Sequence, residues 1–206
     1  MTGTAMPLKE AKRQEPEWLV LVVVAAALLL GWLLKTWVEN RAVTFSNADL
    51  TLGYPADWLR EIGEAEDGVV FEAHDVRSGS LYQTHLTLWI AEAPPQTRQE
   101  NVDPLLSAMT AWTFERGQEL DGYRVLGTEE VEVDGIRGTR IDYVYVSDPL
   151  LSPYRKALPV VVEAMDYLLP YQDKVYVITL AADGDRFEQE SRQFESILRR
   201  VNFAGQ

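Results

Sequence analysis

Two histidines and a neighbouring aspartate are the residues best suited to chemistry in this sequence. His74 and Asp75 are adjacent, and His85 follows within the next expected strand. If these two strands pair antiparallel, His85 comes close to the other two residues, and imidazole and carboxylate groups are common metal ligands. The alternative is that both histidines are ordinary strand residues, since His85 shares its strand face with Thr87 and Trp89, which suits a packed position. The sequence favours this alternative and therefore predicts no bound metal and no cofactor.

Other catalytic signatures are absent from the sequence. The chain has no cysteine, which excludes a thiol nucleophile and a thiolate metal site. It contains no G-x-S-x-G, G-x-G-x-x-G or Walker A motif. Acidic residues lie close together at 129–132 and at 183–185, but an acidic surface produces such pairs by chance. The sequence therefore predicts a protein that is not an enzyme.

Two apolar loops are candidates for binding a protein partner. Loops usually lie on the surface and are polar, whereas residues 148–159 are rich in proline and leucine, and residues 168–171 are expected at a hairpin tip. If the two loops lie close together, they form an exposed apolar patch of the kind that marks interaction sites. The alternative is that they fold back over the sheet and complete its core. The candidate partner-binding residues are Leu150, Leu151, Tyr154, Leu168, Leu169 and Tyr171.

An uncharged apolar run from Trp18 to Leu34 predicts one membrane-spanning helix near the N-terminus. Extended to Val38, this helix is ~31 Å long, which matches a hydrocarbon core of ~30 Å. The alternative is a cleaved signal peptide, whose apolar core is usually shorter and ends in small residues, whereas the alanine cluster here lies in mid-run. We therefore expect an uncleaved anchor. Its interfacial residues are Trp18, Trp32, Lys35 and Trp37.

The charges on either side of this helix predict its orientation in the cell membrane. Lys9, Lys12 and Arg13 precede it, while Lys35 and Arg41 follow it, so we expect a cytoplasmic N-terminus and an extracytoplasmic domain. The formal net charge of −13 belongs to the part that follows the helix, which argues against nucleic acid as a partner. The expected division is a cytoplasmic tail at 1–17, a transmembrane helix at 18–38, a linker at 39–47 and one domain at 48–206.

Hydrophobic alternation and turn signals predict an α+β domain after the linker. Short strands are expected at 43–45, 50–54, 69–73 and 81–91. Asp103 is placed to cap a helix that begins at Pro104 and ends at Gly117. Asp134-Gly135 predicts a tight hairpin of strands 124–133 and 136–146, and a second hairpin of strands 159–168 and 174–182 follows. A closing helix then completes an antiparallel sheet with helices on both faces.

Four stretches of the domain carry a family resemblance: FSN at 45–47, LGYPADW at 52–58, VYVITL at 175–180 and FESILRRVNF at 194–203. With the order of elements, they make residues 43–203 resemble the PsbP-like family, whose type member is an extrinsic protein of photosystem II. The resemblance implies an α/β/α sandwich that binds proteins rather than catalyses, and related bacterial domains are often membrane- or lipid-anchored outside the cytoplasm. The anchor and the proline-rich loop depart from the photosystem protein, so no photosynthetic role is implied.

The anchor and the resemblance together predict a function. We expect a membrane-anchored, non-catalytic accessory subunit that docks on the extracytoplasmic face of a larger membrane complex, such as a respiratory or photosynthetic one. The alternative is an extracytoplasmic module that binds a small ligand or a metal, for which His74, Asp75 and His85 are the best residues. The expected partners are the lipid bilayer and a membrane protein complex.

Overall fold

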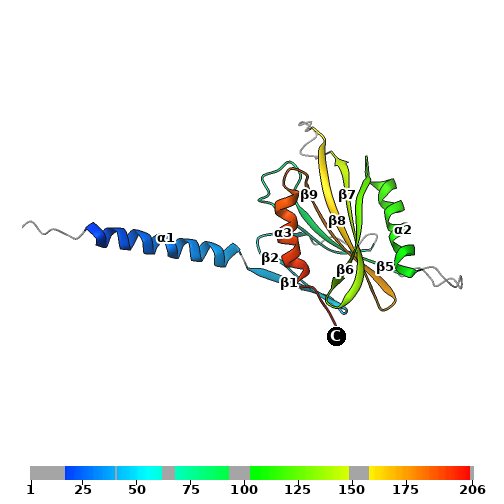
Figure 1. Cartoon of the computed structure of the whole chain (residues 1–206), viewed down its shortest axis with the longest axis horizontal. Coiled ribbons are helices and arrows are strands. Elements are labelled where there is room, and N and C mark those ends of the chain that lie inside the picture. Colours follow the sequence, from blue (N-terminus) through cyan, green and yellow to red (C-terminus); the bar gives the residue numbers. More distant parts are fainter. Residues whose placement is uncertain (1–16, 40, 62–67, 93–102, 149–157, 205–206) are drawn as a thin grey trace, which may run out of the picture. The chain divides into compact units, whose positions relative to one another are not determined.

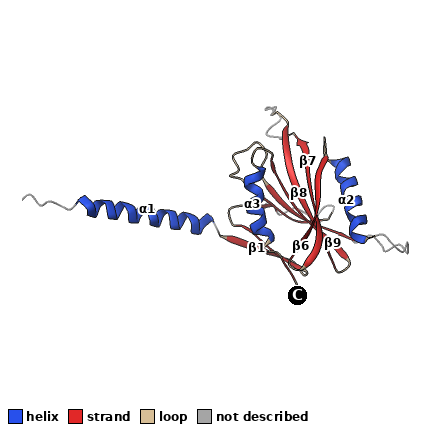
Figure 2. Ribbon diagram, viewed as in Figure 1, coloured by secondary structure: helices blue, strands red, loops and turns tan. Residues whose placement is uncertain are grey.

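The computed structural model describes residues 17–39, 41–61, 68–92, 103–148 and 158–204, shown in Figure 1 with the colours of the sequence. The chain divides into two compact units, residues 1–41 and residues 42–206. Among the described residues, the first unit contains one helix and the second contains two helices and ten strands, which Figure 2 distinguishes by colour.

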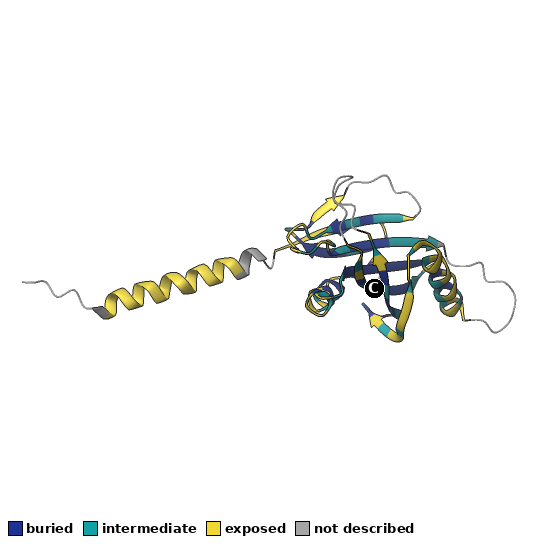
Figure 3. Ribbon diagram, turned by 90° about the horizontal axis from the view of Figure 1, so that it is seen from above, coloured by how far each residue is buried: buried dark blue, intermediate teal, exposed yellow. Residues whose placement is uncertain are grey.

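The first unit contains the helix α1, which spans Glu17–Glu39 and extends one residue beyond the predicted segment at each end. Its stretch Trp18–Lys35 has a mean hydropathy of 2.4, and none of that stretch is buried, as Figure 3 shows in yellow. Trp18 and Trp32 are 63% and 62% exposed, while the side chain of Trp37 lies outside the described part. The structure thus confirms an apolar helix that is long enough to cross a membrane.

A seven-stranded antiparallel sheet forms the centre of the second unit. Its strand order is β3-β4-β5-β9-β8-β7-β6, in which only β5 and β9 are neighbours without being consecutive in the sequence. The strands are β3 (Leu59–Glu61), β4 (Val69–His74), β5 (His85–Glu92), β6 (Arg124–Val133), β7 (Ile136–Ser147), β8 (Val160–Tyr171) and β9 (Lys174–Asp183). Strands β8 and β9 are buried along most of their length, because both faces of the sheet are covered.

A smaller sheet contains β1 (Ala42–Ser46), β2 (Leu50–Pro55) and β10 (Asn202–Phe203), in the order β1-β2-β10. The predicted linker at 39–47 is therefore wrong over most of its length, because β1 pairs with β2 along its whole extent. The side chain of Phe45 is buried, and its ring lies 4.8 Å from that of Phe71 in β4. The domain thus begins at Ala42 rather than at residue 48.

Two helices cover opposite faces of the large sheet, α2 (Pro104–Glu119) on one and α3 (Phe187–Leu198) on the other (Figure 1). Asp103 caps α2 as predicted, since its carboxylate accepts a hydrogen bond of 2.9 Å from the backbone N–H of Leu105. The helix continues through the predicted end at Gly117 and stops at Glu119. Each helix packs its apolar side on a separate core, so the predicted fold class is confirmed.

The turn between β6 and β7 has the geometry that the sequence predicts. Asp134 and Gly135 have φ values of 48° and 72°, as a two-residue type I′ turn requires. The carboxylate of Asp134 also accepts a hydrogen bond of 2.8 Å from the backbone N–H of Phe203 in β10. The turn therefore also joins the large sheet to the small one.

Candidate functional site

Polar side chains lie in a row on the sheet face that α2 partly covers. Alternate residues of paired strands share one face, so Glu72 and His74 of β4 lie beside His85 and Thr87 of β5. Thr179 of β9 pairs with Thr87 and continues the row. A buried polar group costs free energy unless it is hydrogen-bonded. The hydrogen-bond partners of these side chains therefore decide whether this face of the sheet can bind a ligand or a metal.

His74 lies between two carboxylates at one end of the row. Glu61 of the edge strand β3 pairs in register with Glu72 of β4. The His74 Nε2 atom is 3.3 Å from Glu72 Oε1 and 3.8 Å from Glu61 Oε2. This nitrogen is buried and has no well-directed hydrogen bond to any described residue, so the contact with Glu72 is an ion pair when the ring of His74 is protonated. The pairing raises the pKa of His74 and lowers the pKa of Glu72.

His85 lies directly opposite His74, with ring centres 5.6 Å apart, but its partner is elsewhere. The hydroxyl of Tyr82 is 3.0 Å from His85 Nδ1 and 3.2 Å from Nε2. Burial lowers the pKa of His85 to about 4, so its ring is neutral at pH 7. Asp75 does not join the histidines, because its carboxylate accepts a hydrogen bond of 2.8 Å from the backbone N–H of Arg77. Of the three predicted candidates, the structure therefore brings only the two histidines together.

Glu61 and Glu72, which complete the cluster around His74, are the residues that the sequence interpretation missed. Glu72 precedes His74 by two residues within a strand, and this spacing places both side chains on one face. Asp75 follows His74 directly and begins the turn after the strand. The signal for Glu72 was therefore present in the sequence, whereas Glu61 belongs to a three-residue strand that has no usable pattern.

A buried hydrogen-bond network lies beneath α2, around Asp166 of β8. The fully buried carboxylate of Asp166 accepts hydrogen bonds of 2.6 Å from Trp112 Nε1, 2.6 Å from the Thr179 hydroxyl and 3.2 Å from the Tyr143 hydroxyl. Burial raises the pKa of Asp166, while the positive charge of Arg116 and the three donors oppose this rise. The network joins α2 to three strands of the sheet.

Arg116 of α2 lies over two indole rings that contact each other at the edge of this network. Its guanidinium carbon is 4.8 Å from the ring centre of Trp89 and 4.7 Å from that of Trp112. A cavity of about 240 Å³ beside Arg116 reaches Glu72 and His85. Arg116 Nε and Trp89 Nε1 are buried without a hydrogen-bond partner in the described part of the chain. The cavity therefore has room and donors for ordered water or a small polar molecule.

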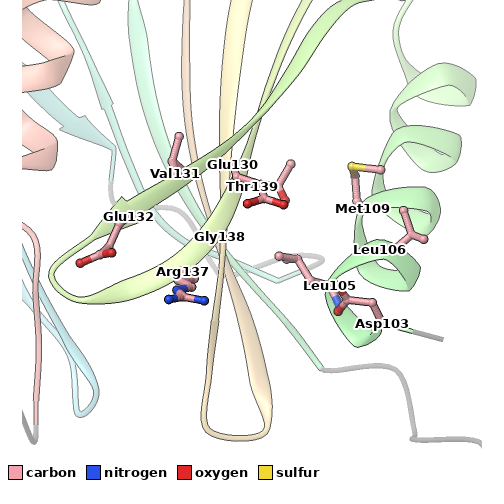
Figure 4. Close-up of a pocket in the computed structure, with 10 residues that line it drawn as sticks. All are labelled: Asp103, Leu105, Leu106, Met109, Glu130, Val131, Glu132, Arg137, Gly138 and Thr139. Carbon is pink, nitrogen blue, oxygen red and sulfur yellow. The ribbon is translucent and has the colours of Figure 1, made fainter. Parts of the chain in front are cut away.

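A wider groove of about 610 Å³ lies between the start of α2 and the β6–β7 hairpin (Figure 4). Leu105 and Met109 line it from the helix, and Glu130, Glu132 and Arg137 line it from the hairpin. The groove thus carries charges of both signs around a small apolar strip. Among the described residues, no buried polar atom without a hydrogen-bond partner lines this groove. The groove therefore shows no preference for a ligand of one charge.

The predicted partner-binding patch is wrong in part. Leu168 and Leu169 are not at a hairpin tip but within β8, and both are fully buried, each on a different face of the sheet. The strand runs three residues further than predicted, to Tyr171, whose hydroxyl donates a hydrogen bond to the carbonyl of Ala204. The other candidates, Leu150, Leu151 and Tyr154, lie outside the described residues.

Comparison with known proteins shows the fold of the second unit. No protein-family model matches the sequence, and no curated protein matches it. The solution structure of PsbP (CyanoP) from Synechocystis sp. PCC 6803 is similar, with a TM-score of 0.51 and 13% identity over 79% of this chain and 92% of that chain. The domain has a PsbP-like fold. Likeness at this level of identity shows the fold alone.

Two further solved structures resemble the chain more weakly. LpqN, described as involved in cell envelope biogenesis of Mycobacterium tuberculosis, has a TM-score of 0.48 and 12% identity over 79% of this chain and 90% of that chain. The Ran-binding protein Mog1p of Saccharomyces cerevisiae has a TM-score of 0.47 and 12% identity, over 80% of this chain and 95% of that chain.

Proposed function

We propose that this chain is a membrane-anchored, non-catalytic accessory subunit whose domain docks on the extracytoplasmic face of a larger membrane complex. The observation that carries the proposal is the helix α1. Its stretch Trp18–Lys35 is strongly apolar, and none of it is buried within the structure. Apolar side chains on this scale are unfavourable in water, so lipid or another membrane protein has to cover them.

Anchoring allows a weak docking surface to be sufficient. A domain held at the membrane meets its neighbours at an effective concentration that is on the order of mM for a short tether. The resemblance to the PsbP-like family supports this role, because members of that family mostly bind proteins. A PsbP-like fold placed after an apolar helix is the arrangement that such a subunit requires.

The buried polar network beneath α2 supports a non-catalytic role for the domain. Asp166, its central acid, is engaged by donors from α2, β7 and β9. A carboxylate whose oxygens are already occupied in this way fixes the helix on the sheet, and it is not free to exchange protons with a substrate. The network therefore serves the packing of the domain.

Membrane extraction tests the anchoring. We expect the full-length chain to stay in the membrane pellet after washing with high salt and with alkaline carbonate. Leu28→Asp, near the middle of α1, should release part of the chain, because a charge there costs about 2.5–3.5 kcal/mol of insertion free energy. Thr36→Asp, at the end of the span, is the matched control. Release of the unaltered chain by salt alone would contradict an anchor.

Cross-linking in intact membranes tests the docking. The cross-linker should attach partner chains to the unaltered full-length protein. The double variant Leu150→Ser/Leu151→Ser should no longer be cross-linked to these partners. Leu126→Ser is the control, because Leu126 is 58% exposed and lies on β6, outside both predicted loops. A form without residues 18–38 should fold but recover no partner. If this truncated form still recovers the same partners, the proposed role of the anchor is wrong.

A further inference from the structure

Three side chains at the β3 edge of the large sheet have the composition of a metal site. Glu61, Glu72 and His74 each offer one ligand atom, and these atoms all lie within 4.8 Å of one another. The strand register explains this convergence. Glu61 lies opposite Glu72 across the β3–β4 pair, and His74 lies two residues further along β4 on the same face. The backbone pairing, rather than the chance approach of long side chains, therefore assembles the cluster.

The two distances from His74 to the carboxylates are close to those between ligand atoms around a coordinated Zn²⁺ ion, and the third pair of ligand atoms lies within 4.8 Å. Ligand atoms that lie about 2.1 Å from a tetrahedral Zn²⁺ are about 3.4 Å apart. His74 Nε2 is 3.3 Å from Glu72 Oε1, and 3.8 Å from Glu61 Oε2. A shift of about 0.4 Å by Glu61 would bring the longer distance to the tetrahedral value. The side chain of Glu61 is 61% exposed and can move without disturbing the core.

We propose that Glu61, Glu72 and His74 bind one divalent transition-metal ion, with Zn²⁺ preferred and water completing the coordination. Zn²⁺ is commonly held by imidazole nitrogen and carboxylate oxygen, whereas Mg²⁺ and Ca²⁺ prefer oxygen ligands alone. His74 Nε2 is buried, lacks a hydrogen-bond partner within the described residues and lies close to both carboxylates. The site is independent of the docking proposed above.

The charges around the cluster favour a cation. Two carboxylates facing one imidazole leave an excess of negative charge even when His74 is protonated, in a chain whose formal net charge is −13. Arg60, the basic residue of β3, lies over the ring of Phe45 and belongs to the other face of the sheet. The half-buried ring of His85 is neutral at pH 7, and its nitrogens face Tyr82. It therefore neither repels the metal nor binds it.

A proton on His74 is the competitor of the metal. Without metal, a protonated imidazole pairs with the Glu72 carboxylate, whose Oε1 lies 3.3 Å from His74 Nε2. Coordination requires the neutral ring, so metal binding releases this proton and the apparent affinity rises with pH. Proton release therefore distinguishes coordination by His74 from attraction to the carboxylates alone.

Calorimetric titration with Zn²⁺ tests the site, using the full-length chain in detergent micelles after removal of metals. We expect one Zn²⁺ per chain, with an affinity that increases from pH 6 to pH 8. The substitutions Glu61→Gln, Glu72→Gln and His74→Gln should each weaken binding by about tenfold or more. Glu115→Gln is the matched control, because Glu115 is an exposed glutamate on α2.

Nitrogen NMR of the imidazole rings locates the metal, because the chain has only two histidines. Zn²⁺ should shift the Nε2 resonance of His74 and leave the nitrogens of His85 nearly unchanged. This readout does not depend on whether a variant folds. Absence of saturable binding, or binding that leaves the His74 resonance unaltered, would overturn the proposal and leave an ion pair between His74 and Glu72.

Discussion

Asp166 in β8 accepts a hydrogen bond of 2.6 Å from the indole N–H of Trp112 on α2, and both side chains are buried. The bond joins the centre of the sheet to the helix that covers it. An isolated carboxylate at this depth would cost several kcal/mol, but Tyr143 and Thr179 also donate to it. A directed polar contact therefore fixes the position of α2, in addition to apolar packing.

Removing this indole donor should destabilise the domain. Trp112→Phe keeps an aromatic ring but leaves Asp166 with one donor fewer, so we expect a loss of about 1.5–3 kcal/mol in the free energy of unfolding. Trp89→Phe is a matched control, because Trp89 also flanks Arg116 but its buried N–H has no partner among the described residues. Urea unfolding should show a smaller loss of about 1 kcal/mol for this control. Equal losses would mean that packing alone holds the helix.

A close backbone approach makes Gly138 of β7 hard to replace. A Cβ atom at Gly138 would lie 2.3 Å from the carbonyl oxygen of Leu168 and 2.7 Å from a methyl carbon of Leu169. We expect Gly138→Ala to lower the free energy of unfolding by about 2 kcal/mol or more, because backbone atoms would have to shift.

Gly127 of β6 provides the control for this prediction within the same hairpin. A Cβ atom there would meet nothing within 4 Å, so Gly127→Ala should change the free energy of unfolding by no more than about 0.5 kcal/mol. Urea unfolding of both variants measures the difference. If Gly138→Ala is as harmless as its control, then β7 and β8 are not as close as the structure places them.

Much of the fold could be predicted from the sequence where the signals are local. Asp103 before Pro104 marks the start of a helix, and Asp134-Gly135 marks a tight turn, because each depends on the chemistry of neighbouring residues. The ends of elements were less predictable. Gly117 does not end α2, since a glycine inside a helix costs only about 1 kcal/mol and the helix continues to Glu119.

Contacts between distant strands could not be predicted from local patterns. Leu168 and Leu169 resemble an apolar loop in the sequence, but a strand covered on both faces buries consecutive residues on opposite sides. The Glu61–Glu72 pairing depends on the register of a three-residue edge strand, which neither composition nor periodicity specifies. The approach of Glu61 to His74 therefore became visible only in the structure.

His85, which is half-buried, gives a last prediction, which concerns the pH dependence of stability. Burial lowers the pKa of His85 from its model-peptide value of 6.5 to about 4 in the folded state. Between these values the unfolded chain binds a proton that the folded chain does not, so stability falls as the pH falls from 6.5 to 4. The full loss due to this residue is about 3 kcal/mol, because each pKa unit corresponds to about 1.4 kcal/mol.

Unfolding in urea between pH 7 and pH 4 measures this dependence. The His85→Gln variant removes the titrating ring, so its stability should fall less steeply than that of the unaltered chain in this interval. His74→Gln is the control. Glu72 raises the pKa of His74 in the folded state, so the contribution of His74 to the free energy of unfolding is present below pH 6.5 and is lost as the pH rises through its folded pKa. The slope between pH 6.5 and 4 should therefore survive in His74→Gln, at a reduced size, because the charge of His74 is a second cause, after burial, that lowers the pKa of His85. If instead it survives in His85→Gln, then His85 is not the group that resists protonation.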